Sequence, residues 1–401
     1  MVRKVIYVIP SWYPSKALPN FGSFIREQCQ LFAMHQPDLF IVIGVRSDTD
    51  LKLSFTRPFQ LIWNFLRNSM QPITIQYFGK NIAEITFPAF SIQNFPQIFT
   101  ARQRDLALQL RCIKYCEKHI GGVNVFHAHV INPGGAIAMR IARKFKIPLV
   151  VTEHRKALIE QLIAAQGDEY HELVQVVDCA DEIIAVSNSQ AQLINSICNR
   201  FPLVIPNFIN EGFFVPKRSF RSSECFVFST LCSLIEGKGV DLLLKAIQLW
   251  MPEWDKVHFK IGGTGYLKDS LQGMAFELKI SHLITWTGFV SREQAPAFYQ
   301  DSDAFVLPSR SESFGIVYIE ALACGLPVIA TRCGGPEEIV NNLNGLLIDI
   351  DDVEQLVMAL KKMYQNYNQY DRGAIRDDFI TRFSSRVGAT RIMDVYNKLI
   401  N

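Results

Sequence analysis

The chain has 401 residues, of which 49% are hydrophobic and 20% are charged. This length exceeds that of one ordinary domain, so we expect two domains, each with a sizeable core. The formal net charge of +3 argues against nucleic acid as a partner, because nucleic-acid binding usually needs a strongly basic face. No apolar segment reaches the length of a membrane-spanning helix, and the short apolar run at 5–9 predicts a buried strand rather than a signal peptide. The composition favours a cytoplasmic protein.

Short apolar strands alternate with longer amphipathic helices in the first half of the chain. This alternation predicts βαβ units, in which helices cover both faces of a parallel sheet. The expected strands are 5–9, 39–45, 123–128, 148–152, 182–186 and 202–206, and helices are expected at 22–34 and 134–145. The following stretch, 206–216, is rich in turn formers and aromatic residues, which indicates a linker between domains.

The alternation restarts after the linker. Its segments are 226–231, 241–250, 257–262, 283–287, 304–307, 315–324 and 327–330. We therefore expect an N-terminal domain at 1–206, a C-terminal domain at 207–383, and a helix at 384–401 that packs back on the first domain. Two doubly wound domains in tandem enclose a deep cleft, and ligands of such sheets lie outside the carboxyl ends of the strands.

Residues 54–100 do not follow the alternation. The stretch 59–65 is aromatic and is flanked by Arg57 and Arg67, which fits an amphipathic helix that lies on a membrane surface. The other interpretation is an insertion on the acceptor side that packs on the N-terminal domain. Only the first interpretation predicts peripheral contact with the inner face of a membrane.

The densest chemical signal follows the expected strand that ends at Leu307. A polar loop comes next, Gly315 opens a helix, and Gly325 ends it. Such a junction directs free backbone N–H groups and the positive end of a helix outward, an arrangement that suits a diphosphate. Glu312 and Glu320, separated by seven residues, are placed to accept hydroxyl protons from one ligand.

This E-x7-E pattern lies between Gly288-Phe-Val on one side and Gly334-Gly-Pro-Glu-Glu-Ile-Val and Asn344-Gly-Leu-Leu on the other. With that frame the chain resembles the retaining glycosyltransferases of family 4, the glycogen-synthase-like branch of the GT-B fold. The resemblance is dense over 225–350 and looser over 1–210. It implies an α/β fold with two Rossmann-like, doubly wound parallel-sheet domains facing a deep cleft, the second of which holds a nucleotide-sugar donor.

The resemblance also implies roles for single residues in the C-terminal domain. Glu312 would bind hydroxyls of the donor sugar, and Glu320 those of the ribose. Lys238, in a segment similar to the family's phosphate-binding loop, would neutralise the leaving diphosphate. The backbone at Ser313, Phe314 and Gly315 would contact the sugar and phosphate, that at Phe289 and Val290 would read the base, and Gly263 would belong to a glycine-rich turn near the nucleotide.

One position departs from the family pattern. Ser233 stands five residues before Lys238, where the family usually has an arginine. The departure implies either weaker binding of phosphate or replacement of the missing cation by another residue, such as Arg310 or Arg332.

In the N-terminal domain, Ser11–Gln28 resembles the first β–α loop of family members that build polysaccharides. There Gly22 would let the backbone approach the donor phosphate. The segments 127–129 and 152–154 each end an expected strand with a histidine. Either His129 or His154 is expected to contact the reacting sugar, and a purely structural role is the alternative for each.

We expect no metal site and no cofactor other than the nucleotide-diphosphate sugar. Two D-x-D triplets, at 48–50 and 301–303, are of a kind that holds a metal–diphosphate in other glycosyltransferases. The second precedes an apolar strand and more readily caps the preceding segment.

The resulting hypothesis is retaining transfer of a sugar from a nucleotide-diphosphate sugar to an acceptor hydroxyl. UDP-sugars are favoured over GDP-sugars as donors. The acceptor would be a glycan or a lipid-linked oligosaccharide, in surface polysaccharide or lipopolysaccharide assembly. The alternatives are a sugar-nucleotide epimerase of GT-B architecture and a catalytically weak subunit that binds nucleotide sugars.

Overall fold

The computed structural model describes residues 3–14, 22–46, 52–53, 63, 72–87, 91–92, 97–217, 225–250 and 256–400. Its contacts divide the chain into two compact units. Unit 1 consists of Met1–Ala185, Ala191–Ile205 and Ala389–Asn401, and unit 2 consists of Val186–Gln190 and Pro206–Gly388. The terminal helix α14 (Ser385–Ile400) therefore begins in unit 2 and continues in unit 1.

Unit 1 is built on an eight-stranded sheet with the order β10-β9-β8-β7-β1-β2-β5-β4. The strands are β1 (Lys4–Pro10), β2 (Leu39–Arg46), β4 (Thr74–Tyr77), β5 (Ile82–Phe87), β7 (Val123–His129), β8 (Leu149–Glu153), β9 (Glu182–Ala185) and β10 (Leu203–Val204). The pairing is parallel except at the edge, where β4 runs antiparallel to β5. The prediction of a parallel sheet is therefore wrong at this edge. The connection between β4 and β5 consists only of residues 78–81, which is too short for a parallel crossover. A separate pair joins β3 (Lys52–Leu53) to β6 (Ser91–Ile92).

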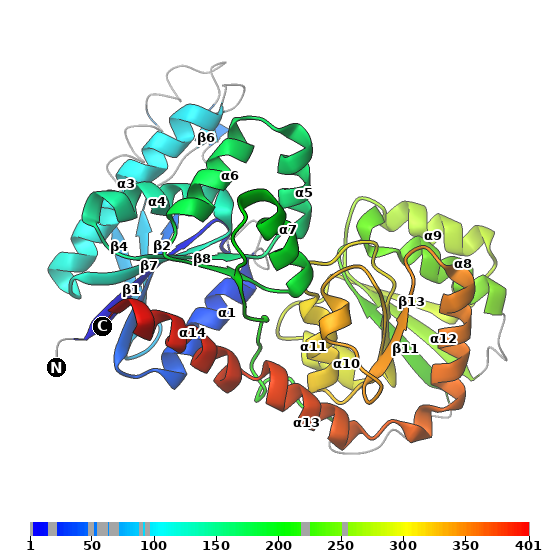
Figure 1. Ribbon diagram of the computed structural model, residues 1–401. Helices are drawn as coiled ribbons and strands as arrows, with labels where there is room; N and C mark the ends of the chain where they lie inside the picture. The colour runs from blue at the N-terminus through cyan, green and yellow to red at the C-terminus, as the bar shows by residue number, and fades with distance from the viewer. Residues whose placement is uncertain are drawn as a thin grey trace. The chain divides into compact units, whose positions relative to one another are not determined.

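Helices cover both faces of this sheet (Figure 1). One face carries α3 (Gln97–His119), α4 (Ala136–Phe145), α5 (Lys156–Ala165), α6 (Asp168–Cys179) and α7 (Asn188–Cys198), and the other carries α1 (Ser23–His35) and the end of α14. Side chains of β1 alternate between the two cores: Tyr7 and Ile9 face the first, and Ile6 and Val8 face the second. Burial on both faces explains why this strand reads as a continuous apolar run.

Unit 2 contains a six-stranded sheet with the order β13-β12-β11-β14-β15-β16, parallel throughout. Its strands are β11 (Phe226–Leu231), β12 (Val257–Gly262), β13 (Ile284–Gly288), β14 (Ala304–Leu307), β15 (Val328–Thr331) and β16 (Gly345–Ile348). The chain moves outward from β11 to β13, returns to β14, and then moves outward in the other direction. The neighbours β11 and β14 therefore flank the topological switch point, where sheets of this kind bind ligands.

Two sets of helices enclose the sheet of unit 2 (Figure 1). One core contains α8 (Val240–Trp250), α9 (Lys268–Glu277) and α12 (Val353–Gln365), and the other contains α10 (Ala295–Gln300), α11 (Ile316–Ala323) and α13 (Arg372–Phe383). The helices α12 and α13 each begin with a capping aspartate. Asp352 accepts a hydrogen bond from the Gln355 N–H at 2.8 Å, and Asp371 accepts one from the Gly373 N–H at 2.8 Å.

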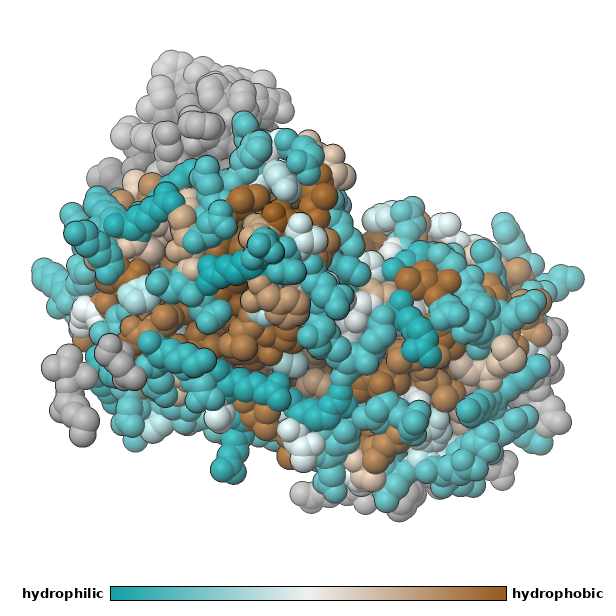
Figure 2. All heavy atoms as spheres, in the orientation of Figure 1, coloured by the Kyte–Doolittle hydropathy of each residue, from teal (hydrophilic) through white to brown (hydrophobic). Residues whose placement is uncertain are grey.

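On the face drawn in Figure 2, hydrophilic side chains predominate, and hydrophobic side chains are visible between them. Within the described ranges, no helix is both long enough and apolar enough to cross a bilayer. The predicted amphipathic stretch at 59–65 lies outside the described residues except for Trp63, and so do Arg57 and Arg67.

Candidate functional site

Lys238 and Glu312 form an ion pair at the switch point of unit 2. Lys238 follows β11 and Glu312 follows β14, and Lys238 Nζ lies 2.6 Å from Glu312 Oε1. The Ser309 hydroxyl donates a hydrogen bond of 2.9 Å to the same carboxylate oxygen. The exposed fractions of the Lys238 and Glu312 side chains are 23% and 10%, so the pair is mostly buried but not closed off from solvent. Ser309 was not a candidate from the sequence, because a serine in a polar loop carries no signal of its own.

Lys238 keeps its positive charge despite this partial burial. Burial by itself lowers the pKa of the ammonium group, but the nearby Glu312 carboxylate outweighs it and raises the pKa above the usual value. Lys238 is therefore protonated at neutral pH. A cation held in place by a carboxylate can receive a phosphate oxygen without having to be ordered first.

The two arginines considered as substitutes for the family's arginine are already engaged. Arg310 lies 2.8 Å and 2.9 Å from the two carboxylate oxygens of Asp241 and 2.6 Å from Asp351. Burial raises the pKa of Asp241, but the bonds from Arg310 outweigh it and the net pKa is lowered. Arg332 is half exposed and lies 3.5 Å from Asp349. Ser233 itself is exposed. Arg310 therefore joins the loop after β14 to the first turn of α8 and to the segment after β16.

Backbone hydrogen bonds tie together the loops at this end of the sheet. Arg310 N–H donates to the Gly237 carbonyl, Leu234 N–H to the Thr264 carbonyl, and Gly263 N–H to the Gly288 carbonyl. Gly263 has a φ of +123°, and a Cβ atom there would lie 1.7 Å from the Cys232 carbonyl oxygen. Only glycine fits this position, so the glycine-rich turn has a packing reason that is independent of any nucleotide.

The segment after Glu312 leads directly into α11. Phe314 is buried and packs against Phe383 at a ring distance of 5.8 Å, while Gly315 is the residue before the first turn of the helix. This packing fixes the backbone of Ser313 and Gly315 at the helix N-terminus. Among the residues predicted to read the base, Phe289 is 52% exposed and Val290 is partly buried against the adjoining core.

Glu320 lies inside α11 and is only 4% exposed. Its carboxylate accepts a hydrogen bond from the Tyr299 hydroxyl at 2.8 Å and forms an ion pair with Arg292. The Arg292 guanidinium lies 4.5 Å from the centre of the Phe214 ring, and this cation–π contact stabilises its position. Neither Arg292 nor Tyr299 was a candidate from the sequence, because each is more than 20 positions from Glu320 and outside the E-x7-E pattern.

In unit 1, three histidines gather at the carboxyl ends of β7 and β8. His129 Nδ1 lies 2.9 Å from His154 Nε2, and the two rings are nearly parallel. His127 lies 2.8 Å from the Thr152 hydroxyl and 2.5 Å from the Tyr396 hydroxyl of α14. Burial lowers the pKa of all three imidazoles, that of His129 to about 3, so they are neutral at pH 7. The structure thus brings both predicted histidines together.

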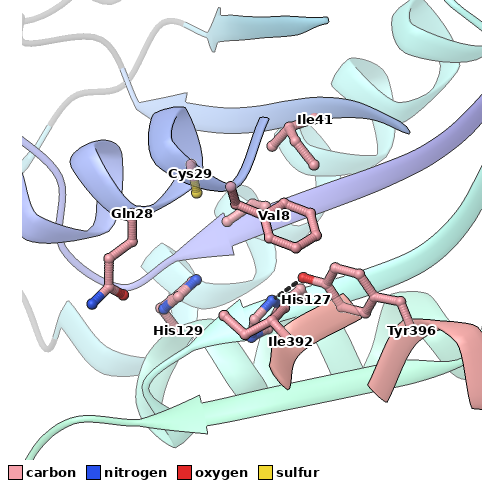
Figure 3. Close-up of a pocket in the computed structure, with 9 residues that line it drawn as sticks. Val8, Gln28, Cys29, Ile41, His127, His129, Ile392 and Tyr396 are labelled. Atoms are coloured by element: carbon pink, nitrogen blue, oxygen red, sulfur yellow. Dashed lines mark hydrogen bonds between the residues drawn. The ribbon is translucent and has the colours of Figure 1, made fainter. Parts of the chain in front are cut away.

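His127 and His129 line a pocket on the α1 and α14 side of the sheet (Figure 3). The remaining lining residues are Val8, Gln28, Cys29, Phe32, Ile41, Ile392 and Tyr396. His154 does not line it. The walls are mostly apolar, and the polar groups come from the histidines, Gln28 and Tyr396.

Gly22 occupies the position before α1 with a φ of +71°. A Cβ atom there would lie 2.6 Å from the Trp12 carbonyl oxygen. The glycine is therefore required by close backbone packing within the loop, whatever it does toward a donor phosphate. Residues 15–21 of the same loop lie outside the described residues.

The D-x-D triplet at 301–303 makes structural contacts. Asp303 accepts a hydrogen bond of 2.8 Å from the Val227 N–H of β11, and Asp301 lies 3.0 Å from Lys217. Asp303 therefore anchors the neighbouring strand, whereas Asp301 is the C-cap residue of α10, so the capping expected from the sequence is confirmed for Asp301 and is wrong for Asp303. The triplet at 48–50 lies outside the described residues, and among the described residues no group of three or more His, Cys, Asp or Glu side chains is placed to hold a metal ion.

Two family models match the chain in succession. The model described as Glycosyltransferase Family 4 matches residues 80–213, and the model described as Glycosyl transferases group 1 matches residues 217–376. The chain belongs to the glycosyltransferases. Together the two matches span most of both units, and the second contains the whole Lys238–Glu312 site.

A relative agrees with this assignment, and two solved structures share the fold. An uncharacterised glycosyltransferase of Methanocaldococcus jannaschii is 29% identical over 281 residues, covering 69% of this chain and 76% of that protein. The sucrose-phosphate synthase of Thermosynechococcus elongatus superposes with a TM-score of 0.74 over 99% of both chains at 18% identity. Anabaena HepE in complex with UDP-glucose superposes with a TM-score of 0.69 over 99% of this chain and 100% of that one, also at 18% identity. Both structures have the GT-B fold, which confirms the predicted fold class for this glycosyltransferase.

Proposed function

We propose that this glycosyltransferase moves a sugar from a nucleotide-diphosphate sugar to an acceptor hydroxyl with retention of anomeric configuration. The observation that carries the proposal is the Lys238–Glu312 pair at the switch point of unit 2, beside the N-terminus of α11. A charged lysine and a helix N-terminus suit the two phosphates, and a carboxylate beside them suits the sugar hydroxyls.

In the proposed mechanism, bond cleavage leaves negative charge on the diphosphate and positive charge on the sugar ring. Lys238 and the backbone N–H groups at Ser313–Gly315 stabilise the leaving diphosphate, while Glu312 holds the sugar by its hydroxyls. Positioning and charge stabilisation then supply most of the rate enhancement. The departing phosphate accepts the proton of the acceptor hydroxyl on the same face of the sugar, which gives retention.

UDP is the proposed nucleotide, with GDP second. HepE, which shares the fold, was solved with UDP-glucose, and this supports a UDP-sugar as the first donor to test. The acceptor in this proposal is a glycan or a lipid-linked oligosaccharide, used in polysaccharide or lipopolysaccharide assembly at the cytoplasmic face of a membrane.

The test is to incubate the purified protein with UDP-sugars and GDP-sugars in EDTA, with and without a panel of glycan acceptors. We expect release of the nucleoside diphosphate from one donor, and a product whose anomeric proton coupling matches that of the donor. Inverted configuration contradicts retention. An isomerised nucleotide sugar formed without any acceptor indicates an epimerase, and tight binding without turnover indicates a binding subunit.

A further inference from the structure

His129 and His154 are joined by a hydrogen bond whose direction can be worked out from their surroundings. The bond runs between His129 Nδ1 and His154 Nε2, so exactly one of these nitrogens carries a proton while both rings are neutral. Neutral rings are expected here because both side chains are at least nine-tenths buried and neither imidazole has a carboxylate as a hydrogen-bond partner among the described residues. The nearby Glu153 uses its oxygens on the backbone N–H groups of Ile131, His154 and Arg155.

The second nitrogen of each ring decides between the two directions. His154 Nδ1 is fully buried and has no hydrogen-bond partner among the described residues. His129 Nε2 also makes no hydrogen bond within the described part of the chain, but it is not sealed from solvent, and His129 lines the pocket.

If His129 donated to His154, the neutral His154 would have to carry its proton on Nδ1. That arrangement buries an N–H group without an acceptor, which is the rarer and more costly kind of orphaned polar group. If His154 donates to His129, the orphaned nitrogen keeps only a lone pair. Both rings are then in the Nε2–H form, the tautomer that free histidine favours in water. The two arguments select the same direction.

We propose that His154 is a positioning residue that locks the tautomer of His129, so that His129 presents an Nε2–H donor to the pocket. The backbone of His154 is itself fastened by the Glu153 carboxylate, which accepts its N–H at 2.8 Å. Phe24 packs against the His154 ring at 4.9 Å and limits its rotation. The position of His154 is thus fixed by contacts at the ends of the neighbouring strands β7 and β8 and by the Phe24 side chain of α1.

The locked tautomer defines which ligand groups fit. A donor at Nε2 requires an acceptor atom, such as the oxygen of a sugar hydroxyl, and repels a second donor or a cation. It also leaves His129 without a lone pair toward the pocket, so His129 does not serve there as a general base. This chemistry rests on the proposed function for the identity of the ligand as a sugar, but the tautomer itself does not depend on it.

The experiment is ¹⁵N NMR of the full chain, labelled selectively at the histidine rings, at pH 7 without substrate. We expect His129 to show a protonated Nε2 and an unprotonated Nδ1, assigned by comparison with His129→Gln. In His154→Phe, which removes the donor, the His129 signals should move toward the average of the two tautomers given by exposed His119. A protonated Nδ1 or an imidazolium in the parent protein overturns the proposal.

Steady-state kinetics supply the second readout. We expect kcat/KM for sugar transfer to fall about tenfold or more in His154→Phe, because the hydrogen bond that fixes the His129 tautomer is lost. His154→Gln, whose amide can donate in place of Nε2, should recover activity to within about threefold of the parent, and His119→Gln is the control. Unchanged kinetics in His154→Phe together with an unchanged His129 spectrum overturn the proposal. If no donor is turned over, the proposed function fails while the NMR result still decides the tautomer.

Discussion

Lys238 Nζ and Glu312 Oε1 lie 2.6 Å apart, although the two residues are separated by 74 positions in the sequence. Each follows a central strand of unit 2, and β11 and β14 are neighbours only because the strand order reverses between them. The fold therefore creates the pair, and removing either partner leaves a charge at a site with little access to water.

Replacing Lys238 by alanine should reduce both stability and transfer. Loss of the ammonium group leaves the Glu312 carboxylate without its counter-ion, and we expect the free energy of unfolding to fall by about 1–3 kcal/mol. Transfer should fall by about two to three orders of magnitude, because a cation at the leaving phosphate is lost. Urea unfolding and initial rates measure the two effects.

Lys217 offers a matched control in the same unit. It lies 3.0 Å from Asp301, and the two side chains are 39% and 61% exposed. Lys217→Ala should change stability by less than about 1 kcal/mol, since exposed ion pairs contribute little. Equal effects of the two lysine substitutions, or full activity in Lys238→Ala or Glu312→Ala, would contradict the assigned role of the Lys238–Glu312 pair.

Gly263→Ala should destabilise unit 2 strongly. Its Cβ atom would lie 1.7 Å from the Cys232 carbonyl oxygen, at a φ of +123°, so the backbone has to move. We expect a loss of about 2–4 kcal/mol. Gly273→Ala is the control: it lies in α9 with nothing within 4 Å of the added atom, and it should stabilise the protein by about 0.5–1 kcal/mol. Thermal unfolding of both variants distinguishes the two signs.

Local sequence patterns predicted the parts of the fold that depend on neighbouring residues. The strand that ends at Leu307, the glycine before α11 and the strand-end histidines at His129 and His154 all lie where the patterns put them. The pairing of β4 with β5 and the partners of the site residues could not be predicted in this way. Arg292 contacts Glu320, and Ser309 contacts Glu312, through tertiary packing that no local periodicity records.

Several helices were not predicted, and two of them, α12 and α13, follow clear capping signals. The segment that forms α12 is amphipathic and follows Asp352, whose side chain caps it. The segment that forms α13 follows Asp371 in the same way. Both helices carry buried core residues such as Leu360 and Phe379.

Glu320→Gln should change how the protein distinguishes ribose from deoxyribose. If the carboxylate accepts a ribose hydroxyl proton, the parent protein should bind UDP about tenfold more tightly than 2′-deoxy-UDP, and the variant should lose this preference. Isothermal titration with the two nucleotides measures the difference. The same preference in parent and variant would assign Glu320 to structure alone, as the anchor of Arg292 and Tyr299.

Stability should fall as the pH is lowered through the ordinary range of histidine. Burial lowers the pKa of His129 to about 3, and burial with the neighbouring rings also lowers those of His127 and His154. Below a pH of about 6.5 the histidines bind protons in the unfolded chain but not in the folded protein. Their contribution to the free energy of unfolding is therefore present above that pH and is lost below it. His129 alone should contribute a loss of about 2 kcal/mol between pH 7 and pH 5.

His129→Gln isolates this contribution, because every other titrating group is common to both proteins. The carboxyl group of Glu153 has a pKa raised by burial, which changes stability with pH in the direction opposite to the histidines and cancels in the comparison. Urea unfolding at pH 7 and pH 5 should give a smaller loss in the variant. Identical pH dependence in parent and variant would mean that His129 accepts a proton in the folded state.

The most direct test of the central claim is thermal unfolding with UDP, GDP and ADP in the presence of EDTA, for the parent protein and for Lys238→Ala. A nucleotide at about 100 times its dissociation constant should stabilise the folded state by about 2.7 kcal/mol. We predict that UDP raises the unfolding temperature of the parent by a few degrees and that Lys238→Ala abolishes the shift. A shift of the same size in both proteins, or no shift with any nucleotide, would contradict a donor site built around Lys238 and Glu312.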